Sequence, residues 1–188
     1  MSDVTRIFSA IEQGDPHAVE QLLPLVYDEL RRLAASQMAQ ERPDHTLNAT
    51  ALVHEAYMRL VPNLQFENRG HFMATAALCM KRILVENARA RARLKRGGGR
   101  QRQSFDLDSL AISIPDEELL ALNDALDRLT QHDPVKAQLV ELHYFAGLSF
   151  PQVAEHLGVS LSTVERGWRY ARAWLYAAMA GEEKSSRS

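Results

Sequence analysis

Apolar residues recur along most of the chain at intervals of three and four positions, as they do on one face of an α-helix. Val4, Ile7, Phe8 and Ile11 begin the pattern, and similar stripes follow as far as Leu175. No stretch alternates apolar and polar residues for long enough to favour a β-strand. The pattern therefore predicts an all-α protein.

Two pairs of residues mark where helices begin. Asp15–Pro16 and Asp133–Pro134 each place a capping side chain before a proline, whose missing N–H is not needed in the first turn of a helix. The periodicity also predicts helices over residues 48–61, from about residue 71 into an arginine-rich segment, and over residues 161–175.

Three consecutive glycines, Gly97–Gly99, interrupt the helical pattern among basic residues. Because glycine sustains a helix poorly, we expect a flexible linker there. The chain is thus predicted to form two small helical domains, residues 1–96 and 116–180. A linker at 97–115 joins them, and a tail at 181–188 follows.

The second domain contains a helix-turn-helix pattern. Ala154 is small enough for two helices to approach closely, Gly158 suits the turn, and Val164 belongs to the apolar side of the second helix. The N-terminal half of such a helix enters the major groove of DNA, where arginines bind guanine edges or phosphates. The plainer alternative is an ordinary corner between two helices with a solvated charged face. The residues expected to contact DNA are Ser162, Thr163, Glu165, Arg166 and Arg169.

The 188 residues include 22 basic and 24 acidic ones, and this net charge of −2 does not by itself favour nucleic-acid binding. The charges are segregated, however. Residues 87–105 carry seven Arg or Lys and no acid, whereas residues 106–133 carry eight acids and a single arginine. A basic stripe on a mildly acidic protein indicates a localised phosphate contact, although a run of charge is more often only a solvated face.

Several classes of function are not favoured by the sequence. The single cysteine, Cys79, cannot form an intramolecular disulfide, and no apolar window is long enough for a membrane span. We therefore expect a cytoplasmic protein. His54 and Glu55 resemble part of a zinc-protease helix, but Met58 stands where the second histidine would be. We expect no metal, no cofactor, no catalytic residues and hence no enzyme.

The order of these elements resembles the bacterial sigma factors of the extracytoplasmic-function (ECF) type, over nearly the whole chain. Ala51–Leu60 is similar to the core-binding helix of their region 2, and Phe72–Arg91 to the helix that melts the promoter and binds its minus-ten element. The helix-turn-helix, with Thr163–Arg166, is similar to region 4, which reads the minus-thirty-five element. The resemblance implies a protein that catalyses nothing and gives RNA polymerase its promoter specificity.

The resemblance also implies partners and contact residues. Region 2 would dock on the β′ clamp helices of core RNA polymerase, region 4 on the β flap, and both on promoter DNA, with no membrane involved. The loop 66–71 would capture a flipped base, and a basic stripe would hold phosphates. The polymerase-binding residues would be Asn48, Thr50, Leu52, Val53, Glu55 and Arg59, and the minus-ten residues would be Asn68, Arg69, His71, Lys81, Arg82, Arg89 and Arg91.

Two departures from the family pattern matter. Members usually carry an acidic Asp-x-Glu-Asp run before the core-binding helix, where this chain reads Asn48–Ala51. We therefore expect weak docking unless a Ser/Thr protein kinase phosphorylates Thr50; the alternative is that Asn48 and Thr50 are simply helix caps. In the recognition helix, Glu165 and Gly167 stand where basic or polar contact residues are usual.

Two other functions remain open at this point. A helix-turn-helix transcriptional regulator acting without polymerase docking would bind a symmetric operator tightly on its own. An RNA-binding or structural helical protein is the third possibility. Co-elution of the protein with core polymerase would distinguish a sigma factor from both of these alternatives.

Overall fold

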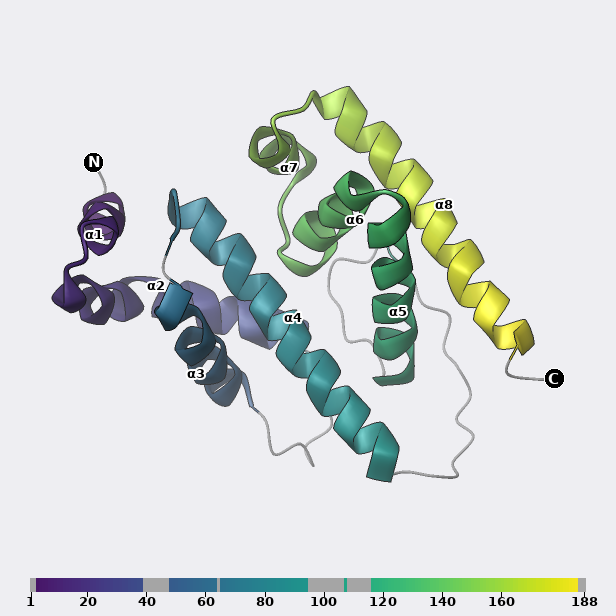
Figure 1. Cartoon of the computed structure of the whole chain (residues 1–188), viewed down its shortest axis with the longest axis horizontal. Helices are drawn as coiled ribbons and strands as arrows, with labels where there is room; N and C mark the ends of the chain where they lie inside the picture. Colours follow the sequence, from purple (N-terminus) through teal and green to yellow (C-terminus); the bar gives the residue numbers. More distant parts are fainter. Residues whose placement is uncertain (1–2, 39–47, 64, 95–106, 108–115, 186–188) are drawn as a thin grey trace. The chain divides into compact units, whose positions relative to one another are not determined.

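The computed structural model describes residues 3–38, 48–63, 65–94, 107 and 116–185. These residues form helices and short connections without any β-strand, which confirms the all-α prediction (Figure 1). The glycines at 97–99 and most of the expected linker lie outside the described residues. Leu107 is the described residue of that segment. It is fully buried, and its N–H donates a hydrogen bond of 2.9 Å to the hydroxyl of Tyr176.

The chain divides into two compact units, and the division falls after Ile83. The first unit contains α1 (Asp3–Glu12), α2 (Pro16–Gln37), α3 (Ala49–Leu60), a 3₁₀ turn (Val61–Asn63) and the first part of α4 (Arg69–Leu94). The second unit contains the end of α4, α5 (Asp116–His132), α6 (Pro134–Val140), a π-helical turn (Glu141–Phe145), α7 (Phe150–Leu157) and α8 (Leu161–Ser185).

The core of the first unit is made by α2, α3 and α4. Leu22, Leu52 and Met80 are completely buried, and each such side chain contributes about 1.5–3 kcal/mol when it leaves water. Tyr57 of α3 donates a hydrogen bond of 2.7 Å to the carbonyl oxygen of Val19 in α2. Burial raises the pKa of this phenol, so it remains a neutral donor that ties the two helices together.

Both predicted helix starts are confirmed. The carboxylate of Asp15 accepts a hydrogen bond from the N–H of His17 at 2.9 Å, and that of Asp133 accepts one from the N–H of Lys136 at 3.1 Å. In each case the following proline occupies the first turn. These local caps set where α2 and α6 begin, because they satisfy N–H groups that have no partner within the helix.

In the second unit, α8 runs along α5, α6 and α7 (Figure 1). Its buried face contains Val164, Trp168 and Ala171. Gly167 belongs to the same face: a Cβ added there would lie 2.9 Å from Cδ1 of Leu139 in α6. Gly167 is therefore a packing residue and does not stand at a DNA-contact position, which corrects the sequence-based interpretation.

The turn between α7 and α8 depends on Gly158, which has a left-handed φ of 64°. Replacing Gly158 by alanine should lower the free energy of unfolding by about 1 kcal/mol, because this conformation is unfavourable for a residue with a Cβ. Gly181 of α8, where an added Cβ meets nothing within 4 Å, is the matched control. Gly181→Ala should be neutral or raise stability by about 0.5–1 kcal/mol. Urea unfolding of both variants measures the difference; equal destabilisation would contradict it.

Candidate nucleic-acid interface

The exposed face of α8 carries a concentrated set of polar and charged side chains. Ser162, Arg166 and Arg169 are all exposed, and at 3.6 residues per turn they lie opposite the buried Val164 and Ala171. Thr163 and Glu165 are exposed on the edges of this face. All five residues expected to contact the minus-thirty-five element are thus accessible on the N-terminal half of one helix.

The two arginines of this face lie along their own helix. Nε of Arg166 donates to the carbonyl oxygen of Ser162 at 3.3 Å, and Nε of Arg169 donates to that of Glu165 at 3.4 Å. These geometries are those of weak hydrogen bonds between exposed groups. The guanidinium groups can therefore swing outward toward a ligand at little energetic cost.

A cluster of hydroxyl groups begins α8. Oγ of Ser160 accepts a hydrogen bond from the N–H of Thr163 at 3.2 Å and lies 2.8 Å from Oγ1 of Thr163 and 3.1 Å from Oγ of Ser162. Ser160 is thus the capping residue of α8, and it holds the hydroxyls of Ser162 and Thr163 at the helix start. A capping side chain two or three residues before the residues expected to contact DNA is the sequence signal for this role.

His143 packs against both helices of the helix-turn-helix, α7 and α8. Its ring lies 4.4 Å from that of Phe150 in α7 and 4.7 Å from that of Trp168 in α8. Its Nδ1 lies 2.7 Å from the carbonyl oxygen of Leu148. The imidazole comes from the π-helical turn, a local widening of the helix that the periodicity does not predict.

In the first unit, the loop before α4 is anchored by aromatic rings. Phe66 is buried and packs against Phe72 with ring centroids 5.2 Å apart, and against Phe8 of α1 at 6.4 Å. The rings of His71 and Phe66 pack edge to face, with their centroids 5.6 Å apart. The loop that is expected to capture a base is therefore held in shape by apolar contacts with α1 and α4.

The polar groups of this loop already have partners within the chain. Oδ1 of Asn68 accepts from the N–H of His71 at 2.9 Å and so caps α4, while Nδ1 of His71 accepts from the N–H of Glu67 at 3.4 Å. Arg69 forms a two-point ion pair with Glu29 of α2, in which Nε lies 3.3 Å from Oε2. A base bound here would have to compete with these contacts.

The basic residues of α4 that are expected to bind DNA phosphates are only partly available for that role. Lys81 is 4% exposed, so its ammonium group is not presented to phosphates, contrary to the expectation from the resemblance. Arg82 is exposed. Arg91 forms a two-point ion pair with Asp116, at 2.7 Å from each oxygen, and Arg89 lies 3.5 Å from Asp124.

The expected polymerase-binding residues of α3 fall into two groups. Leu52 and Val53 are completely buried, so these apolar side chains support the helix and offer no docking surface. Thr50 is exposed at the second residue of the helix, and the exposed Asn48 caps it by accepting from the N–H of Ala51 at 2.8 Å. Arg59 and Glu55 form an ion pair of 2.7 Å at the surface.

Sequence reasoning missed two further residues of this surface. His54 is exposed, and Met58 is 71% exposed although it is apolar. Together with Thr50 they stand at intervals of four residues, which places them on one face of α3. That spacing is the signal by which the sequence could have indicated them.

The described ranges contain no group of three or more His, Cys, Asp or Glu residues that could hold a metal ion. Among the helices that the structure describes, none is long and apolar enough to cross a membrane. A protein-family model described as ECF sigma factor matches residues 1–181. No curated protein matches the chain.

Proposed function

Since the chain belongs to the ECF sigma factor family and is thus an alternative sigma factor for transcription initiation, we propose that α3 docks on core RNA polymerase and that α8 reads the upstream promoter element. The observation that carries the proposal is the exposed face of α8, which presents Ser162, Arg166 and Arg169 opposite its buried side. Residues 1–96 and 116–180 are the proposed functional domains.

In this proposal the loop before α4 contacts the minus-ten element. Arg69 exchanges its carboxylate partner, Glu29, for DNA, and Arg82 contacts the backbone. Because the loop is anchored through Phe66, its shape survives this exchange. The ion pair is about 40% exposed on both sides, so the exchange has a small energetic cost.

Docking on polymerase is proposed to be regulated by phosphorylation of Thr50. The first turn of α3 contains no acidic residue, and Thr50 is exposed there. A phosphate adds a charge of about −1.5 to −2, which the N-terminus of a helix stabilises. The cap is provided by Asn48, which supports a role for Thr50 other than capping.

The direct test is promoter binding with and without polymerase. The phosphorylated protein should co-elute with core polymerase, and only that complex should bind promoter duplex tightly. The protein alone should bind DNA weakly and with a steep dependence on salt, because its contacts are mainly to phosphates. Tight binding of a symmetric operator by the free protein would instead identify a regulator that acts without polymerase.

A further inference from the structure

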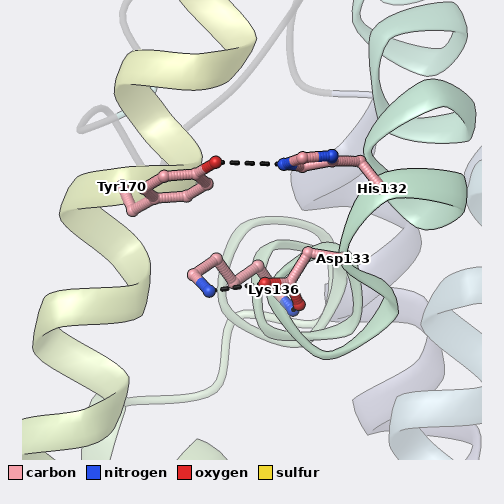
Figure 2. A network of polar contacts seen from close by, with 4 residues as sticks. All are labelled: His132, Asp133, Lys136 and Tyr170. Atoms are coloured by element: carbon pink, nitrogen blue, oxygen red, sulfur yellow. Dashed lines mark hydrogen bonds and ion pairs between the residues drawn. The ribbon is translucent and has the colours of Figure 1, made fainter.

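A second group of polar side chains lies beside the proposed DNA-reading face of α8 (Figure 2). Tyr170 stands four residues after Arg166 and therefore on the same edge of the helix, one turn further along. It is 44% exposed, which is high for a large aromatic side chain. Figure 2 shows its hydroxyl pointing toward His132 at the end of α5, with Nε2 and Oη 3.1 Å apart.

Neighbouring groups hold these two rings in place. The imidazole of His132 stacks on Trp174, the next residue of that edge, with centroids 6.0 Å apart and planes at 15°. Nζ of Lys136, from α6, lies 4.8 Å from the centroid of the Tyr170 ring. Three donor-bearing side chains from α5, α6 and α8 thus meet at one exposed place.

Asp133 is the acidic member of the cluster. Its carboxylate pairs with Nζ of Lys136 at 2.5 Å, and hydrogen bonds from the side chain and backbone of Lys136 lower its pKa. Asp133 therefore remains ionised and directs the lysine toward α8 instead of letting it extend into solvent. The carboxylate also weakens the attraction of Lys136 for an anion. An anion bound here should therefore gain less affinity than it would from a lysine without an acidic partner.

We propose that Tyr170, His132 and Lys136 bind one backbone phosphate of the DNA strand that flanks the major groove entered by α8. Hydroxyl, imidazole and ammonium groups are ordinary donors to DNA phosphates, and such contacts position a protein without reading sequence. This contact rests on the proposed function. It would set the position of α8 along the major groove.

The test uses the protein bound to core polymerase and an upstream duplex selected by the wild-type complex from a random library. Single phosphates of that duplex are replaced by uncharged methylphosphonate, one position at a time. Wild-type affinity should fall severalfold at one linkage beside the groove. Lys136→Gln should bind the unmodified duplex severalfold more weakly, show a smaller further loss at that linkage than the wild type does, and have a salt slope shallower by at most about 0.9.

Two variants complete the experiment. Tyr170→Phe removes only the hydroxyl. It should also reduce the loss of affinity at that linkage, but by less than Lys136→Gln does. Arg172→Gln removes a charge from the other side of α8, two residues on, and should not couple to that linkage. If Lys136→Gln and Tyr170→Phe lower the unfolding temperature but couple to no linkage, the cluster only fastens α8 to α5 and α6, and the proposal is wrong. If the wild-type complex selects no upstream sequence at all, the proposed function fails instead.

Discussion

Protein carrying phosphothreonine at position 50 is expected to bind core RNA polymerase roughly 10- to 150-fold more tightly than the unmodified protein. One charge-assisted contact at an interface contributes about 1.5–3 kcal/mol, and about 1.4 kcal/mol corresponds to a tenfold change in affinity. The first turn of α3 has no acidic side chain, so the unmodified protein lacks a charge-assisted contact with polymerase there. Titration of core polymerase with both forms measures the difference.

Substitutions separate the phosphate from other effects of the position. Thr50→Glu, with one charge and a shorter reach, should fall between the two forms, and Thr50→Ala should bind as weakly as the unmodified protein. Thr5, an exposed threonine in the first turn of α1, gives the matched control, since Thr5→Ala should leave the response to phosphorylation intact. Strong binding by Thr50→Ala, equal to that of the phosphorylated protein, would end the idea.

Replacement of Arg166 or Arg169 by alanine is expected to weaken binding of the upstream promoter element by about 1–3 kcal/mol each, roughly 5- to 150-fold. Each arginine stands on the exposed face of α8, and its present contact is a long hydrogen bond to its own helix that DNA can replace. Each substitution should also relax the sequence preference at one base pair, since a bidentate contact to a base is lost.

Arg172 provides the control for these two substitutions. It lies on α8 three residues beyond Arg169 and farther from the start of the helix that is proposed to enter the groove, so Arg172→Ala should have a smaller effect. Transcription from promoters with matched and altered upstream elements measures all three variants. If neither Arg166→Ala nor Arg169→Ala changes upstream-dependent transcription, then α8 does not read the promoter.

Much of the fold could be predicted because its signals are local. The caps at Asp15 and Asp133 act within three residues, and the turn at Gly158 depends on the conformation of one residue. The apolar spacing likewise indicated the buried side of α8, on which Val164 lies. Such features are decided by neighbouring residues, which a sequence displays directly.

The candidate site was harder to predict because its groups have distant partners. Glu29 is 40 residues from Arg69, and His132 is 38 residues from Tyr170. Lys81 is basic by type yet buried by the packing around α4. Sequence spacing predicts which face of a helix a residue occupies, but not which element covers that face.

The close approach of Gly167 to Leu139 limits how this protein can change over evolutionary time. Mutations at Ser162, Arg166 or Arg169 alter exposed side chains, so the proposed promoter contacts can change with little loss of folding stability. A larger residue at position 167 would push α8 away from α6 and shift all three of these exposed side chains together. Under the proposed function, new specificities are therefore reachable through single substitutions on the outer face of α8, while its inner face keeps the helix in one place.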